Sequence, residues 1–246
     1  MKIIDCFWEL KNLDRRVVEI SIDKEDIFDV DEFLEGIYNY DYAVVRVPAN
    51  RVDINSILAE LSFTFFECQY RISKSLQSFD FSNPLVKRII PKIQFKEITD
   101  SSDLEIILSQ MTENMFSSDR ITLDPSLGPN YGLRRYSNWL ETEFANNTSK
   151  IILAYYKNNP VGFSMYRESG NNVEALLGGL FEKYQALGLG ILTPSILFLY
   201  SLTREEQKFD KMITSISSNN MPVIEWYNYL GFNLFFRNNK YIFYTT

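Results

Sequence analysis

The stretch that decides the fold is Gln185-Ala-Leu-Gly-Leu-Gly190. It follows an apolar run typical of a strand and leads into residues 191–206, which we expect to form a largely buried helix. Glycines at the start of a helix expose backbone N–H groups, and such groups can hold a pyrophosphate. The same pattern also occurs as a plain turn between a strand and a helix, so by itself it leaves both interpretations open.

A second pattern follows in residues 220–232. Asn220 stands before Met221-Pro222, which is typical of a helix N-cap with proline in the first turn. The predicted helix, 222–230, carries Tyr227 and ends at Gly231-Phe232. Alone, Asn220 is explained by capping and Tyr227 by packing in a core. The two patterns together are more specific than either one.

Composition removes several classes of function. The 246 residues are 46% hydrophobic and include no histidine, and the net charge is −7. An acidic chain argues against nucleic acid or an anionic membrane surface as the main partner. Without histidine, Ser-His-Asp and Cys-His hydrolases and His-ligated zinc are excluded for this chain alone. Cys6 and Cys68 have no metal-ligand spacing, so we expect no metal.

No apolar run reaches the ~20 residues that a membrane-spanning helix needs. We therefore expect no membrane association and a cytoplasmic protein. Whether the protein is a homodimer is left open.

Alternating strands and helices indicate a smaller α/β domain over residues 1–90. Its expected strands are 17–22, 42–47 and 63–72, and its expected helices are 29–39 and 52–61. Residues 73–91 form the expected connector.

Residues 91–246 indicate a second domain of the α+β class. Its expected elements are strand 93–98, helix 103–115, a surface loop over 117–130, helix 131–144, antiparallel strands 150–156, 161–166 and 173–181, strand 211–218 and a final hairpin over 233–245. Because the strands before Gln185 look antiparallel and Thr193 stands at the third glycine position, a dinucleotide-binding fold is disfavoured.

Gly178-Gly179 interrupts the last of the three antiparallel strands. Glycine weakens a strand, so a bulge, a ligand close to the backbone, or a tight contact between the sheet and a helix must explain the pair.

With its glycine pattern, Asn220, Tyr227 and Gly231-Phe232, the chain resembles the GCN5-related N-acetyltransferases over about its last 150 residues. The resemblance implies that family's fold, a mixed and mostly antiparallel twisted sheet flanked by helices, and it implies acetyl-coenzyme A as cosubstrate. It assigns coenzyme binding to residues at the strand end, in the glycine turn and in the next helix: Leu180, Phe181, Gln185, Ala186, Leu187, Gly188, Leu189, Gly190, Ile191, Asn220 and Tyr227.

Tyr227 is at the position of that family's general acid, which protonates the departing thiolate. The chemistry suits a chain without histidine, because an amine attacks the thioester directly and a backbone N–H near Gly178-Gly179 can meet the developing oxyanion. Glu174 is a candidate general base, with a solvent-facing strand residue or a water chain as the alternatives.

The whole chain is also similar to the TDP-fucosamine acetyltransferase group, through Tyr40–Pro48, Met115–Arg120, Asp124-Pro125 and Tyr136-x-x-Trp139. That similarity implies the 4-amino group of a nucleotide-linked deoxyamino sugar as acceptor. The alternatives left open are another small amine, a peptide N-terminus, an antibiotic, or a coenzyme A-binding module without catalysis. Arg120, Arg134 and Arg135 are the candidates for contact with an acceptor diphosphate, although such arginines are often solvated.

Overall fold

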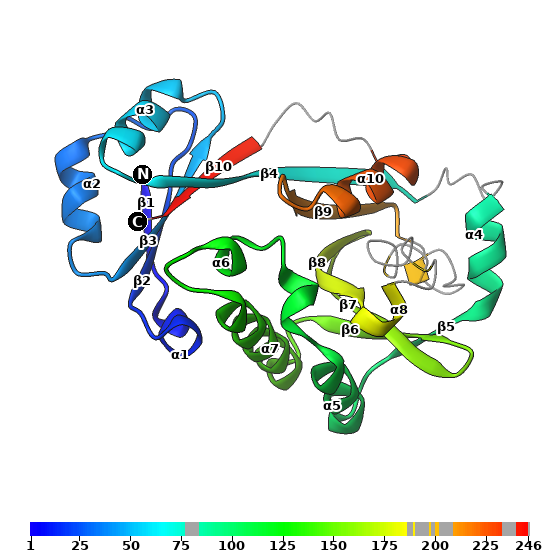
Figure 1. Cartoon of the computed structure of the whole chain (residues 1–246). Helices are drawn as coiled ribbons and strands as arrows, with labels where there is room; N and C mark the ends of the chain where they lie inside the picture. Colours follow the sequence, from blue (N-terminus) through cyan, green and yellow to red (C-terminus); the bar gives the residue numbers. More distant parts are fainter. Residues whose placement is uncertain are drawn as a thin grey trace.

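The computed structural model describes residues 1–76, 84–185, 189, 197, 200–201, 209–232 and 240–245. Its described strands form one ten-stranded sheet in the order β1-β2-β3-β10-β4-β9-β8-β7-β6-β5 (Figure 1). In chain order they are β1 (Lys2–Asp5), β2 (Val17–Ser21), β3 (Tyr42–Pro48), β4 (Thr64–Ser75), β5 (Ile93–Glu97), β6 (Lys150–Tyr156), β7 (Asn159–Ser169), β8 (Asn172–Leu180), β9 (Lys211–Ser217) and β10 (Lys240–Thr245). Only the β2–β3 and β8–β9 pairs are parallel.

Helices flank the sheet. The described ones are α1 (Leu10–Leu13), α2 (Val30–Ile37), α3 (Val52–Glu60), α4 (Pro84–Ile89), α5 (Ser101–Gln110), α6 (Arg120–Leu123), α7 (Pro129–Asn146), α8 (Glu182–Gln185) and α10 (Met221–Tyr229). Short 3-10 turns are η1 (Phe7–Glu9), η2 (Ile90–Lys92) and η3 (Glu113–Phe116). The α+β class and the mixed, mostly antiparallel sheet predicted from the sequence are confirmed.

Each face of the sheet is covered by its own helices. Phe33 of α2 and Ile54 and Leu58 of α3 pack on Val45 and its neighbours in β2 and β3. On the same face, Tyr227 and Leu230 pack against the β9 residues Met212 and Ile216. The opposite face carries α5 and α7, whose apolar side chains pack on β6 and β7. Alternate strand residues point to opposite faces, which explains how one sheet supports both layers.

The described elements repeat along the chain, although no repeat is visible in the sequence. Antiparallel β1 and β2 are followed by α2, parallel β3, α3 and β4; antiparallel β7 and β8 are followed by parallel β9, α10 and β10. The last strand of each repeat pairs with a strand of the other repeat, which we call strand exchange. Strand β4 of the first repeat pairs with β9 of the second, and β10 of the second pairs with β3 of the first. Strands β10 and β4 then pair with each other at the centre.

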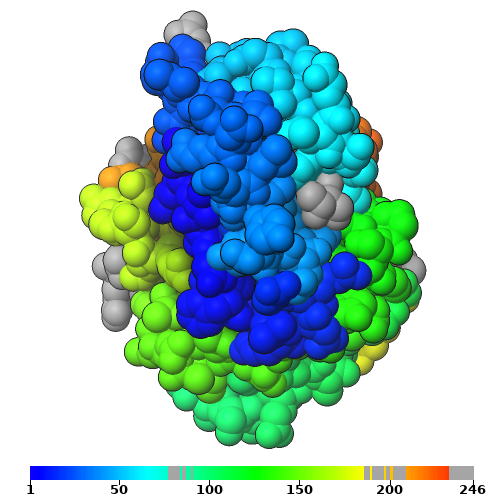
Figure 2. Space-filling view, turned by 90° about the vertical axis from the view of Figure 1, so that its left-hand side faces the viewer, coloured from blue at the N-terminus to red at the C-terminus, as the bar shows by residue number. Residues whose placement is uncertain are grey.

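Because of this exchange, one sheet contains strands from both predicted domains. The domain boundary near residue 91 stays a prediction. In Figure 2, the blue and cyan surface of the N-terminal part lies directly against the green surface of the middle of the chain.

Three local predictions need correction. Residues 117–130 contain a short helix, α6, because Asp119 accepts a hydrogen bond from Ile121 N and caps it. Helix α5 ends at Gln110 rather than at 115, since Met111 is extended with ψ 135. The prediction that 240–245 is the second strand of a final hairpin is wrong. Strand β10 pairs with β3 along one edge and with β4 along the other, so neither edge is left for a hairpin partner.

Candidate functional site

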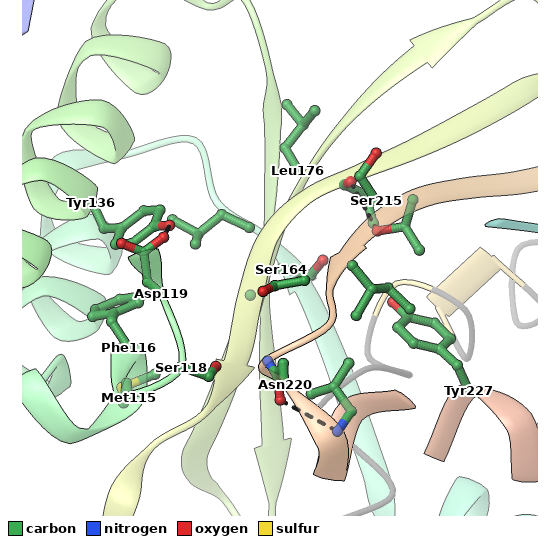
Figure 3. A pocket seen from close by; sticks show the side chains of 17 residues that line it. Met115, Phe116, Ser118, Asp119, Tyr136, Ser164, Leu176, Ser215, Asn220 and Tyr227 are labelled. Atoms are coloured by element: carbon green, nitrogen blue, oxygen red, sulfur yellow. Dashed lines mark hydrogen bonds between the residues drawn. The ribbon is translucent and has the colours of Figure 1, made fainter. Parts of the chain in front are cut away.

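Strands β8 and β9 begin as a parallel pair and then separate. Their register runs from Asn172 with Lys211 to Ala175 with Thr214, and the described residues show no pairing between them beyond that point. Both strands nevertheless continue, β8 to Leu180 and β9 to Ser217. The separation forms a cleft of about 210 Å³ (Figure 3). Strand edges that lack a ladder partner can hydrogen-bond an extended ligand that carries amide groups.

The cleft passes from one face of the sheet to the other. Thr214 and Ile216 line it on the face that carries α10, and Ser215 and Ser217 line it on the opposite face. Such alternation follows from the strand repeat. A ligand in the cleft can therefore meet groups from both faces.

Tyr227 lines the cleft from α10, as Figure 3 shows. Its ring packs edge-on against Phe232, with centroids 4.7 Å apart. Burial raises the pKa of its phenol well above the usual value, while a hydrogen bond with Thr214 opposes the rise. The phenol is therefore protonated at neutral pH and can donate a proton. Its role as a general acid stays a prediction.

Asn220 is the N-cap of α10, and its side chain accepts a hydrogen bond of 3.4 Å from Val223 N. It also lines the cleft beside Tyr227. The capping role predicted from the sequence is confirmed. Coenzyme binding by Asn220 stays a prediction.

The glycine turn is described only in part. Ala186, Leu187, Gly188, Gly190 and Ile191 lie outside the described residues, whereas Leu180, Phe181 and Leu189 are buried. The Gln185 side chain donates a 3.4 Å hydrogen bond to Leu180 O, so it binds the end of β8. None of Leu180, Phe181, Gln185 and Leu189 lines the cleft as described.

Gly178 allows two strands to approach closely. A Cβ at this position would stand 2.6 Å from Phe163 O and 2.9 Å from Ser164 Cα. The register of β7 and β8 also shifts between Met165 and Tyr166, which marks a bulge nearby. A close strand contact therefore explains Gly178. At Gly179 a Cβ would meet only Met115 Cε, at 3.8 Å.

A pair of polar side chains closes the cleft on the α7 side. The hydroxyl of Tyr136 donates to Asp119 Oδ1 at 2.5 Å, and the Tyr136 ring stacks on Phe116 with centroids 4.4 Å apart. These residues belong to the segments that the sequence linked to the acceptor.

A larger cavity of about 740 Å³ adjoins the cleft. The two share the lining residues Asp119, Tyr136, Ala175, Leu176, Leu177, Ser215 and Ser217. The wall of the larger cavity combines β2, β3, β4, β7, β8 and β9 with η1, α1, α6 and α7, so both predicted domains contribute. The charged side chains in that wall are Glu9, Glu19, Glu67, Asp119, Glu143 and Glu174 with Lys11, Arg46, Arg120, Arg135 and Arg167. Neither sign dominates.

The predicted arginines separate in the structure. Arg120 and Arg135 line the large cavity, whereas Arg134 is not in its described wall. Arg134 donates to Asn12 O at 2.6 Å and to Asp14 at 2.6 Å. Arg135 is 2.7 Å from Glu9.

Glu67 is the functional candidate that the sequence did not reveal. It lines the large cavity from β4, and it is only 6% exposed. In the sequence it follows Phe63-Thr-Phe-Phe66, and an acidic residue in such a run is typical of the solvent-facing side of a strand. Only the pairing of β4 with β9 places it near the cleft.

Two kinds of feature are absent from the described part of the chain. No helix in it is both long and apolar enough to cross a lipid bilayer. Nor does it hold a group of three or more Cys, Asp or Glu side chains arranged for a metal ion.

Comparison with known proteins found no matching family model and no matching curated sequence. Solved structures do match. A functionally unknown conserved protein from Staphylococcus epidermidis is 12% identical, with a TM-score of 0.56 over 93% of this chain and 82% of that one. A GCN5-related N-acetyltransferase-like protein from Streptococcus suis is 15% identical, with a TM-score of 0.52 over 93% of this chain and 79% of that one.

A GCN5-related N-acetyltransferase from Sphaerobacter thermophilus is 10% identical, with a TM-score of 0.53 over 83% of this chain. This chain spans 59% of the length of that protein. The chain therefore has the fold of the GCN5-related N-acetyltransferases.

Proposed function

We propose that the protein is an N-acetyltransferase that transfers an acetyl group from acetyl-coenzyme A to an amine. The observation that carries the proposal is the cleft between β8 and β9, which crosses the sheet and holds Tyr227 on one face. The cleft supplies two strand edges that have no ladder partner among the described residues, for an amide-containing arm, and a protonated phenol for a leaving thiolate. The fold shared with proteins named N-acetyltransferases adds support.

Bound acetyl-coenzyme A would supply an acetyl group activated as a thioester. The residues of this chain would do the rest. The edge of β8 up to Leu180 would bind the pantetheine arm, and the glycine turn at 185–190 would bind the pyrophosphate. Tyr227 would hold its proton on the α10 face until a thiolate forms. The large cavity on the other face would position the amine.

For the acceptor, we propose an amine that also carries an anionic group. The mixed charge of the large cavity supports such a molecule, because carboxylates suit an ammonium group and Arg46 and Arg120 suit an anion. A nucleotide-linked 4-amino sugar, the acceptor that the sequence suggested, combines these two charges. Trp8 and Trp139 in the same wall offer apolar faces to a ring.

The test combines binding with turnover. Acetyl-coenzyme A at about 100 times its Kd should stabilise the protein by about 2.7 kcal/mol. Thiol release is then measured with a nucleotide-linked amino sugar, a polyamine, an aminoglycoside and a peptide with a free N-terminus. Release with the amino sugar alone supports the proposed acceptor, whereas release with one of the other amines keeps the activity and changes the acceptor. Stabilisation without release from any amine would identify a coenzyme A-binding module instead.

A further inference from the structure

Strand exchange brings an acidic residue of the N-terminal part to the cleft. Strand β4 pairs with β9, with Gln69 opposite Ser217, and Glu67 lies one step further along the same face. On its other side, β4 pairs with β10, where Phe243 stands between Glu67 and Arg46 in one row across three strands. Glu67 therefore lies on the cavity face, beside the end of β9.

The partner of Glu67 is a neutral hydroxyl. Burial raises the pKa of the Glu67 carboxyl, and a hydrogen bond with the Ser217 side chain works against that rise. From α6 and its cap, Arg120 lowers this pKa and Asp119 raises it. The other charged groups of the wall near this face are Arg46 on β3, Glu174 on β8 and the Arg135–Glu9 pair from α7 and η1.

Ser217 connects Glu67 with the cleft, because Ser217 lines both the cleft and the large cavity. Tyr227 and Thr214 are on the opposite face, covered by α10. Glu67 and Tyr227 thus flank the opening from opposite faces. Such a separation suits acyl transfer to an amine, because one proton leaves the amine on one side while another reaches the thiolate on the other.

The other carboxylates of the wall are already committed. Glu174, the candidate base from the sequence, is 3.0 Å from Arg71. Glu9 is bound by Arg135, and Asp119 holds the Tyr136 hydroxyl and the N-terminus of α6.

Two more carboxylates are also poor candidates. Glu143 accepts hydrogen bonds from Trp139, Thr148, Ser149 and Arg167. Glu19 is on β2, four strands from β9 in the sheet, which places it roughly 19 Å away at about 4.8 Å per strand.

We propose that Glu67 is the general base that removes a proton from the acceptor amine. The assignment rests on the proposed acetyl transfer. In the balanced step, the amine nitrogen forms a bond to the acetyl carbon as the carbon–sulfur bond breaks. Glu67 takes one proton from the amine, and the thiolate receives the phenolic proton of Tyr227.

The main test is Glu67→Gln, with Glu60→Gln as a matched control, because Glu60 is exposed on α3. Glu67→Gln should lower kcat/KM for the acceptor by about 10²–10⁴-fold. The thermal shift with acetyl-coenzyme A should stay unchanged, and activity should recover at high pH, where the amine is already neutral. Wild-type kcat/KM in the variant, with the acidic limb of the pH profile intact, would overturn the assignment.

A second variant covers the case in which Glu67→Gln does not fold. Ser217→Ala removes a hydrogen bond that lowers the pKa of Glu67. The acidic limb of the pH profile should then move to higher pH, and a limb that stays in place would count against Glu67. If the wild-type protein releases no thiol with any amine, the proposed function itself fails. If the wild-type protein releases thiol and Glu67→Gln is as active as the wild type, the function stands and the base is another group.

Discussion

Nε of Arg135 lies 2.7 Å from Oε1 of Glu9, so a partly buried ion pair joins α7 to η1 across the wall of the large cavity. The other carboxylate oxygen, Oε2, accepts a 2.9 Å hydrogen bond from Asn12. The first residues of the chain are therefore held against the middle of the chain by charge as well as by apolar packing.

Glu9→Gln should leave the Arg135 charge without its carboxylate. Breaking a buried pair from one side costs about 3–5 kcal/mol, and Arg135 keeps 23% of its side chain exposed, so we expect a loss of about 3 kcal/mol. Urea unfolding at pH 7 measures the loss. The double variant Glu9→Gln with Arg135→Met should recover part of it; a double variant no more stable than the single one would show that the unpaired charge is not the cause.

Tyr227→Phe should reduce turnover far more than acetyl-coenzyme A affinity. The phenyl ring keeps its packing on Phe232, and only the proton donor is lost. We expect kcat to fall by about 10²–10⁴-fold. Tyr229→Phe is the matched control, because Tyr229 is on the same helix and is 46% exposed. Unchanged thiol release by Tyr227→Phe would remove Tyr227 from the mechanism.

Gly178→Ala should destabilise the sheet at the cleft. Its Cβ would stand 2.6 Å from Phe163 O, and a backbone atom in a central strand cannot move away freely. We expect a loss of about 1–3 kcal/mol in urea unfolding, the usual range for overpacking. Gly179→Ala, whose nearest contact is 3.8 Å away, should have a much smaller effect. Equal losses for the two variants would contradict the strand-contact explanation.

Glu143 should contribute stability that acid removes. Burial alone would raise its pKa, but hydrogen bonds from Ser149, Arg167, Thr148 and Trp139 outweigh burial and lower the pKa to about 2. The unfolded chain binds this proton near pH 4.5, so the contribution is complete above that pH and disappears as the pH falls toward 2.

The free energy of unfolding of the wild type should therefore fall between pH 4.5 and 2 more steeply than that of Glu143→Gln. Urea titrations across that window measure the slopes. Glu141→Gln, at an exposed position of the same helix, should keep the wild-type slope. Parallel slopes for wild type and Glu143→Gln would show that the hydrogen-bond cluster does not hold the carboxylate.

Local patterns predicted many of the elements, because they depend on neighbours in the chain. Apolar runs between turn residues predicted the strands 150–156 and 173–181, and Asn220 marked the start of α10. Helix α6 was missed because its four residues are too few to show a helical period.

Pairings between distant strands could not be predicted. Nothing in residues 64–75 indicates that Gln69 will stand beside Ser217, since register between distant strands depends on the whole sheet. For the same reason the sequence identified Asn220 and Tyr227 but not Glu67. The family pattern covers residues near the glycine turn, whereas Glu67 reaches the cleft only through the exchanged strand.

The exchanged strands also set the order in which the protein can be completed during synthesis. Strand β3 is made early, yet its neighbour β10 comes from residues 240–245. Until those residues leave the ribosome, β3 and β4 each have an open edge where β10 will stand, and open edges invite pairing with other chains. Between the synthesis of β4 and that of β10, the nascent chain therefore carries two open strand edges, and residues 240–245 are the ones that cover both of them.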